Sequence, residues 1–272
     1  MSDRPSALTS EQCAAVAAMI DHALLDPTLG RADLEAGCRL ARDYSVASVC
    51  IVPWAVPLCA GILAGSAVRT STTIGFPHGA NATTTKLAEA RAALADGATE
   101  LDMVVNLSWV LDGAWHAVGD EIGAIAAATH DGGGKLKVIF ENACLNDAQK
   151  IRLCEICGES GADWVKTSTG FGPGGATEAD VALMRRHAPA ACGVKAAGGI
   201  RDLDTLLRFR ALGADRVGAS RTAAMCAGVV PQHPPTKLTS PSRANSPNSC
   251  AVTSGVSSKP VSLIGLGRPA LG

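Results

Sequence analysis

Residues 162–202 of this 272-residue chain read ADWVKTSTGFGPGGATEADVALMRRHAPAACGVKAAGGIRD. Two short apolar strands are predicted within it, at 164–167 and 193–196. A glycine-rich connection and a segment of helical periodicity, 177–187, lie between them. Strands joined through a helix run parallel, because a connection of this length is a crossover and not a hairpin. The stretch is therefore a βα unit followed by the strand of the next unit.

The same unit recurs from residue 21 to residue 220. Strands are predicted at 20–25, 45–52, 69–74, 100–105, 135–141, 164–167, 193–196 and 216–218. Helices are predicted at 31–43, 55–63, 84–96, 109–130, 147–160, 177–187 and 202–212. Left-handed C-caps are predicted where helices end at Gly97, Gly161 and Gly213. Eight strands with crossover helices favour an α/β fold, a closed (β/α)8 TIM barrel, over an open doubly wound sheet.

A change in composition marks the end of the barrel. Residues 222–230 are compatible with a short last helix, whereas Pro, Ser, Thr and Asn dominate from 231 onward. Such a segment has too few apolar residues to offset the entropy that ordering costs. We therefore predict a single barrel domain over residues 1–230 and a disordered C-terminal tail over 231–272.

Charge and composition exclude several classes of partner. With 24 basic and 25 acidic side chains the formal net charge is −1, so no nucleic-acid partner is expected. Residues 1–10 lack the basic and apolar regions of a secretory signal, which predicts a cytoplasmic protein. Residues 46–68 carry no charge, but Pro53 and Pro57 interrupt them, so they are interpreted as a strand and a buried helix rather than a membrane span.

The cysteines are interpreted as reduced core residues. Ten cysteines in a chain of this length fall short of the density of a disulfide scaffold. Cys154 and Cys157 form a CxxC pair, but no second CxxC and no paired histidine accompany it. Core packing is therefore favoured over a zinc or redox site, and no metal site is predicted.

Charged residues inside apolar strands are the candidates for chemistry. Lys166, Lys195 and Asp102 lie on the sixth, seventh and fourth predicted strands, where they can project into one barrel interior. A buried lysine beside a second cation is pushed toward its neutral form, and a neutral amine attacks carbonyls to form a Schiff base. Asp102 can then relay protons. The alternative is that each lysine extends to solvent or neutralises a nearby carboxylate.

Lys137 is a further candidate, for substrate binding. It lies in KLKVIFE on the predicted fifth strand, and alternation along that strand places Glu141 on the same face.

Two loops indicate a phosphate site. AAGGIRD (196–202) follows the seventh strand and VGASR (217–221) follows the eighth, where barrels often bind phosphate through backbone N–H groups. Gly198, Gly199 and Ser220 are the candidate ligands, and the loop that begins at Thr167 can form a third wall. The alternative is that these are only tight turns. The position of the two loops after the seventh and eighth strands favours a phosphorylated small molecule as the ligand.

Longer matches identify a family. The chain resembles deoxyribose-phosphate aldolase, a class I aldolase with a (β/α)8 barrel. The matching stretches are DHALLDPT (21–28), SVCIVP (48–53), TTIGFPHGANATTTKLAEA (72–90), ELDMVVN (100–106), KVIFENACL (137–145), DWVKTSTGFGPGGAT (163–177), GVKAAGGIRD (193–202) and ADRVGAS (214–220).

The resemblance implies reversible cleavage of 2-deoxy-D-ribose 5-phosphate to D-glyceraldehyde 3-phosphate and acetaldehyde. It implies that Lys166 is the Schiff-base nucleophile, that Lys195 perturbs its pKa and that Asp102 relays protons. It also implies that Cys50 lines the substrate pocket. No metal or organic cofactor is then expected, because the iminium is itself the electron sink. A homodimer is compatible with the sequence.

Departures from the family pattern leave other functions open. Ala23 and Asp26 stand where the family usually has Thr and Lys, and Arg221 stands where many members have Ser or Ala. A related barrel lyase acting on another sugar phosphate is one alternative. A non-catalytic sugar-phosphate-binding homologue is the other, although a pure binder has no need to bury two lysines together.

Overall fold

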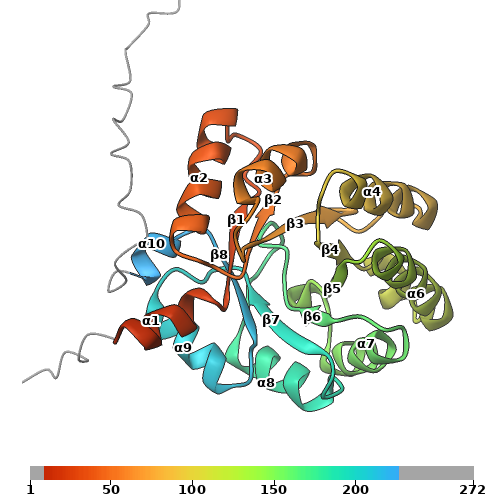
Figure 1. The fold of residues 1–272 in the computed structure, drawn as a ribbon. Helices are drawn as coiled ribbons and strands as arrows, with labels where there is room; N and C mark the ends of the chain where they lie inside the picture. The colour runs from red at the N-terminus through yellow and green to blue at the C-terminus, as the bar shows by residue number, and fades with distance from the viewer. Residues whose placement is uncertain (1–8, 227–272) are drawn as a thin grey trace, which may run out of the picture. The chain divides into compact units, whose positions relative to one another are not determined.

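A computed structural model describes residues 9–226, in which eight parallel strands close into a barrel (Figure 1). Each strand pairs with its neighbours in chain order, and β8 pairs with β1 to close the ring. The strands are β1 (Ile20–Leu24), β2 (Ser48–Ile51), β3 (Arg69–Ile74), β4 (Glu100–Val104), β5 (Lys135–Ile139), β6 (Trp164–Lys166), β7 (Gly193–Ala197) and β8 (Arg216–Ala219). The predicted (β/α)8 barrel is confirmed.

Helices surround the strands on the outside of the ring (Figure 1). The α-helices are α1 (Ser10–Ala17), α2 (Arg31–Asp43), α3 (Val56–Leu63), α4 (Thr83–Ala95), α5 (Leu107–Leu111), α6 (Trp115–Asp131), α7 (Asp147–Glu159), α8 (Glu178–His187), α9 (Leu203–Ala211) and α10 (Thr222–Met225). Two 3-10 turns, η1 (Pro53–Ala55) and η2 (Asn142–Cys144), follow β2 and β5.

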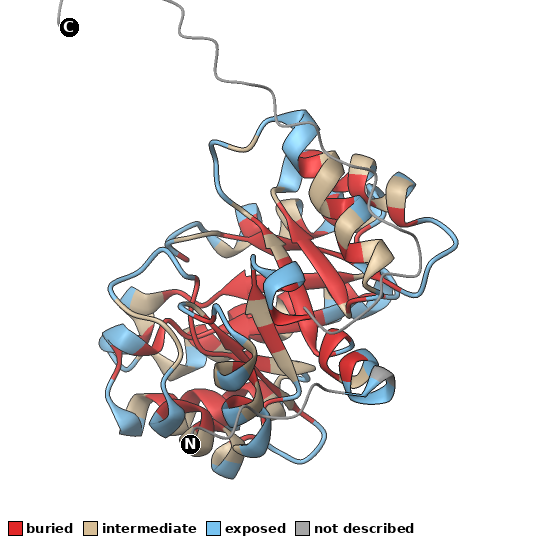
Figure 2. Cartoon of the chain, turned by 90° about the vertical axis from the view of Figure 1, so that its left-hand side faces the viewer, coloured by how far each residue is buried: buried red, intermediate tan, exposed pale blue. Residues whose placement is uncertain are grey.

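The strand residues divide between two environments. Most side chains that face the helices are apolar and buried, as Val49, Leu101 and Val138 show. Figure 2 colours the buried residues red, and most of the strand residues are among them. Side chains that face the interior of the ring include charged groups such as Asp102 and Lys195, also fully buried. Charged residues are almost never fully buried unless they are paired. The interior of the barrel is therefore the place to look for a site.

The predicted helix ends are confirmed. Gly97, Gly161 and Gly213 have φ angles of 104°, 80° and 96°, in the left-handed region that glycine adopts without a steric penalty. Cys154 and Cys157 are buried core residues with free thiols, as the interpretation of the CxxC pair expected.

Some predicted boundaries are wrong. The single helix expected at 109–130 is two helices, α5 and α6, because Gly113 takes a φ of 70° and ends the first. The second strand begins at Ser48 and not at 45, because Ser45 has a φ of 52°. The fifth strand ends before Glu141, which has a φ of 55°. A positive φ is incompatible with a continuing strand.

The N-terminal helix α1 was not predicted. The hydroxyl of Thr9 accepts from the backbone N–H of Gln12, and the Gln12 side chain accepts from the N–H of Thr9. The expected tail, 231–272, lies outside the described residues, as do residues 227–230 of the expected last helix. Within 9–226, no helix combines the length and hydropathy that crossing a bilayer requires.

Candidate active site

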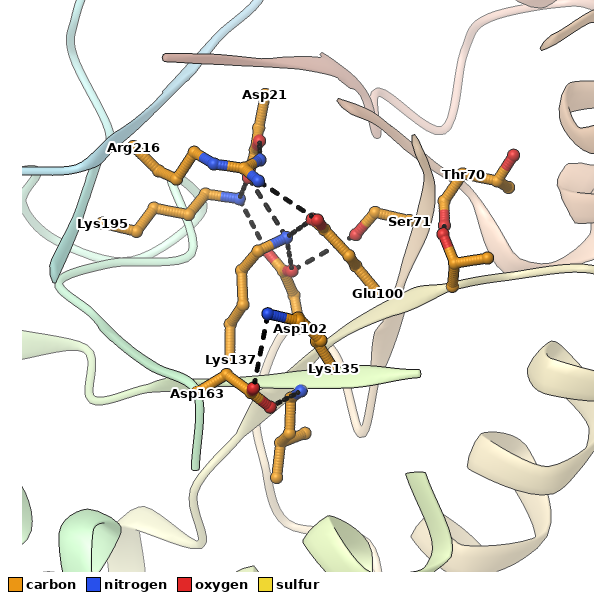
Figure 3. A network of polar contacts seen from close by, with 12 residues as sticks. Asp21, Thr70, Ser71, Glu100, Asp102, Lys135, Lys137, Asp163, Lys195 and Arg216 are labelled. Atoms are coloured by element: carbon orange, nitrogen blue, oxygen red, sulfur yellow. Dashed lines mark hydrogen bonds and ion pairs between the residues drawn. The ribbon is translucent and has the colours of Figure 1, made fainter. Parts of the chain in front are cut away.

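Seven charged side chains cluster in the barrel interior, and all of them except Lys166 are labelled in Figure 3. The acidic members come from β1 and β4, and the basic members come from the four strands β5 to β8. The members are Asp21, Glu100, Asp102, Lys137, Lys166, Lys195 and Arg216. We call this set the ion cluster.

Asp102 is the shared partner of three lysines. Its Oδ2 atom accepts from the ammonium groups of Lys166 and Lys195, each at 2.7 Å. Its Oδ1 atom accepts from Lys137 at 3.0 Å and from the hydroxyl of Ser71 at 3.3 Å. The three residues for which a joint catalytic role was predicted from sequence therefore meet at one carboxylate oxygen.

The remaining members of the ion cluster distinguish Lys195 from Lys166. Asp21 Oδ2 lies 2.6 Å from the Lys195 nitrogen and 3.2 Å from that of Lys137. Arg216 bridges the two outer carboxylates, contacting Asp21 at 2.7 Å and Glu100 at 3.2 Å. Lys195 thus contacts two carboxylates, whereas Lys166, within residues 9–226, forms an ion pair with Asp102 alone.

These contacts separate the pKa values of the two lysines. Burial and the nearby Lys195 ammonium lower the pKa of Lys166, against the opposing attraction of Asp102. Burial also acts against the charge on Lys195, but Asp102 and Asp21 outweigh it, so the pKa of Lys195 is raised. A neutral Lys166 leaves three cations facing three carboxylates. The charge balance of the ion cluster therefore favours a free amine at Lys166.

Trp164 closes the cluster on the side of the strand N-termini. Its ring lies 5.2 to 5.7 Å from the charged groups of Lys135, Lys137 and Arg216, within cation–π range. A Cβ atom at Gly193 would lie only 2.3 Å from this ring, so the absence of a side chain there makes room for the indole.

A pocket of about 590 Å³ opens above the ion cluster. Lys166, Lys195, Asp21 and Cys50 contribute to its lining, while Asp102 lies behind the two lysines. Burial and the charge of Asp102 raise the pKa of the Cys50 thiol. The two lysines that share Asp102 are thus accessible to a small molecule that enters the pocket.

The predicted phosphate ligands line the same pocket. Gly198 and Gly199 have φ angles of 91° and 80°, and a Cβ at Gly199 would point into open space. Ser220 and Arg221 approach from the loop after β8, and Arg201 approaches from the loop after β7. Two glycines, a serine and two arginines from neighbouring loops therefore line the same pocket, and backbone N–H groups, hydroxyls and guanidinium groups are groups that bind anions.

Besides Asp102, two residues predicted to bind substrate do not line this pocket. Lys137 is fully buried beneath it, 2.6 Å from Glu100 and 3.0 Å from Asp102. Thr167 is also buried, and its hydroxyl donates to the carbonyl of Ala197 and accepts from the N–H of the same residue, both at 3.0 Å. Thr167 thereby ties the end of β6 to β7.

Sequence reasoning missed Asp21, Glu100 and Arg216. Glu100 precedes Asp102 by two residues on one strand, so alternation alone places both on the same face. Asp21 follows an apolar run and Arg216 precedes one, so the sequence around each residue could also have marked it as a candidate. Of the departures from the family pattern, Ala23, Asp26 and Arg221 all line the pocket.

Comparison with known proteins gives consistent matches over the barrel. A family model described as DeoC/LacD family aldolase matches residues 15–230. A deoxyribose-phosphate aldolase of Rhodopirellula baltica is 60% identical over 210 residues, which cover 77% of this chain and 87% of that protein. One from Caldanaerobacter subterraneus is 47% identical over 206 residues, covering 75% and 89%.

Solved structures of aldolases are also similar to this chain. The aldolase QR15 has a TM-score of 0.74 at 38% identity, covering 78% of this chain and 94% of its own. A deoxyribose phosphate aldolase from Aeropyrum pernix, described as tetrameric, has a TM-score of 0.74 at 32% identity, covering 82% and 97%.

Proposed function

The chain belongs to the DeoC/LacD family of aldolases, and from this premise we propose that it is a deoxyribose-phosphate aldolase that works through a Schiff base on Lys166. The observation that carries the mechanism is the pair of lysines on Asp102 Oδ2, of which only Lys166 has a lowered pKa. Its reaction is the reversible cleavage of 2-deoxy-D-ribose 5-phosphate.

The first step is attack of the neutral Lys166 amine on the C1 aldehyde of the open-chain sugar. The nitrogen forms a bond to C1, and the carbonyl oxygen takes up two protons, one of which the attacking amine gives up, and leaves as water, which gives an iminium ion. Asp102 Oδ2 lies 2.7 Å from both lysine nitrogens, so it can receive a proton from the attacking amine and exchange it with Lys195.

Cleavage follows from the electron demand of the iminium. Removal of the C3 hydroxyl proton forms the carbonyl of glyceraldehyde 3-phosphate, the C2–C3 bond breaks, and its electron pair enters an enamine on Lys166. Protonation of the enamine carbon and hydrolysis by water release acetaldehyde and restore the amine. No redox change occurs, and the iminium serves as the electron sink.

The phosphate end of the substrate is assigned to the anion-binding side of the pocket. Gly198 and Gly199 offer backbone N–H groups, Ser220 offers a hydroxyl, and Arg221 adds a positive charge that many members of the family lack. Cys50 contributes to the wall, while Thr167 and Lys137 act from beneath it, by holding β7 and the carboxylates in place.

Borohydride trapping tests this function. Reduction in the presence of 2-deoxyribose 5-phosphate converts the iminium to a stable secondary amine, and peptide mass analysis should place the adduct on Lys166. The matched control is Lys135→Gln, which removes an exposed lysine of β5 and should leave the adduct in place. An adduct on another lysine, or turnover retained in Lys166→Met, would refute the assignment.

We also propose that the protein is a cytoplasmic homodimer. The free thiols of Cys38, Cys59 and Cys154 are compatible with a reducing compartment. Trp54 of η1 is 63% exposed beside the uncharged helix α3, which supports an interface there. Light scattering should give the mass of two chains, and Trp54→Ser should reduce it to one; a wild-type monomer would contradict the dimer.

A further inference from the structure

The last described helix, α10, follows directly on the two pocket residues Ser220 and Arg221. It comprises only Thr222–Met225. A helix of four residues has no stability of its own, because nucleation costs more than so few hydrogen bonds return. Tertiary contacts must therefore fix its position, and with it the turn that carries Ser220 and Arg221.

His22 supplies a directed contact to this helix. Its Nδ1 atom lies 2.9 Å from the hydroxyl of Thr222, the first residue of α10. Both residues are buried, His22 at 4% exposure and Thr222 at 1%. Such a hydrogen bond holds the two side chains in one relative position. Breaking it would leave a buried polar atom with neither a protein partner nor water to replace it, and that is costly.

The strand register explains why His22 can reach α10. Along β1, Asp21 faces the ion cluster and Ala23 lines the pocket, so alternation turns His22 to the outer face of the barrel. In the pairing of β1 with β8, His22 lies opposite Ala219, the residue just before Ser220. His22 is therefore placed beside the point where the chain leaves β8 for the pocket.

We propose that His22 is a positioning residue for the phosphate end of the substrate, acting through Thr222 on the turn formed by Ser220 and Arg221. It does not touch the substrate or the reacting lysines. The inference rests on the proposed function, because it takes the group bound by that turn to be the sugar phosphate. Its effect is on the affinity for the phosphate and not on the chemistry at C1.

Substitutions at Thr222 test the proposal. Thr222→Val keeps the shape and removes the hydroxyl, and it should raise the KM for 2-deoxyribose 5-phosphate about three- to tenfold, as expected from losing one hydrogen bond. The kcat, and the kcat/KM for 2-deoxyribose without phosphate, should remain within twofold. Thr222→Ser retains the hydroxyl and should restore the KM. A fall in kcat, or an equal loss on both sugars, would overturn the proposal.

Substitutions at His22 provide a second series. The amide of His22→Asn stands close to the Nδ1 position and should retain the contact, whereas that of His22→Gln stands one atom further out. KM for the phosphorylated sugar should therefore rise more in His22→Gln. Equal values for the two variants would contradict a role for the Nδ1 contact.

Binding of inorganic phosphate separates this inference from the proposed function. Its dissociation constant, measured by titration without turnover, should rise in Thr222→Val by the same factor as the KM and return in Thr222→Ser. If wild type and Thr222→Val bind phosphate equally, or if wild type binds none, the inference fails. The borohydride adduct on Lys166 is independent of both outcomes and decides the proposed function alone.

Discussion

Lys195 forms an ion pair with Asp21, at 2.6 Å, in addition to the contact with Asp102 that it shares with Lys166. This pair accounts for the different pKa shifts of two lysines that share Asp102. Lys195 keeps its proton because two carboxylates hold it, and its charge in turn lowers the pKa of Lys166. The asymmetry of the site thus originates on β1, one position before His22.

Asp21→Asn should remove that asymmetry. With one carboxylate fewer, the pKa of Lys195 should fall, so that Lys195 carries less charge and lowers the pKa of Lys166 less. We expect kcat to fall about 100-fold, the size of loss typical when a preorganised charge is removed from a site. Steady-state kinetics measures it. Asp26→Asn, at a carboxylate that lines the pocket without contacting the lysines, is the control and should change kcat less than twofold. An equal loss of kcat in Asp21→Asn and Asp26→Asn would contradict a role of Asp21 in separating the pKa values of the two lysines.

Lys195→Met should shift the pH profile toward alkali. In the proposed mechanism Lys166 must be deprotonated to attack, so activity should rise with pH through the pKa of Lys166. That pKa is lowered in part by the Lys195 charge, and losing the charge raises it. The acid limb of kcat/KM should then move to higher pH, and kcat/KM at pH values on the limb should fall. An unmoved limb would show that Lys195 does not perturb Lys166.

Lys137→Met should destabilise the fold. Its ammonium lies within 3.2 Å of Asp21, Glu100 and Asp102, and burial of these acids without their cation is costly. Removing one partner of a buried ion pair costs about 3–5 kcal/mol. Urea unfolding measures the difference. Lys135→Met, on the same strand with a side chain 59% exposed, should change stability by less than about 0.5 kcal/mol. Similar losses in both variants would exclude a special role for Lys137.

The stability of the protein should fall between pH 6.5 and pH 4 in part because of His22. Burial lowers the pKa of His22 to about 4 from an ordinary value of 6.5, so the unfolded state binds this proton first as pH falls. The full effect, reached below pH 4, is about 3 kcal/mol, and it is absent above pH 6.5. His22→Asn should flatten this part of the curve, whereas His116→Asn, at a side chain 92% exposed, should not. A wild-type curve unchanged by His22→Asn would refute the assignment.

Sequence alone predicted the barrel because its periodic signals are local. Apolar strands, glycine caps such as Gly97 and crossover helices each depend on a few neighbouring residues, and all agreed on one fold. Helix α1 was detectable too, since Thr9 and Gln12 have the spacing of a capping box. The split at Gly113 was harder, because helices tolerate an isolated glycine.

The candidate site was predictable only in part. Lys166, Lys195 and Asp102 attract attention because each is charged within an apolar strand. The partners of these residues depend on the register of strands distant in sequence. Whether Asp21 faces Lys195 or solvent depends on how β1 pairs with β8. No local sequence pattern gives the distance between Asp21 and Lys195.

The position of Trp164 has a consequence for the route by which substrate and products enter and leave the barrel. Its indole lies at the first residue of β6, against Lys137 and Arg216 and away from the strand ends where the pocket opens, so we expect sugar and water to enter, and both aldehydes to leave, through the pocket mouth. Glyceraldehyde 3-phosphate that still occupies the pocket is then expected to stand between the enamine and the solvent. Departure of the triose before hydrolysis follows as the order of release, and isotope exchange between acetaldehyde and solvent should then proceed without any triose present.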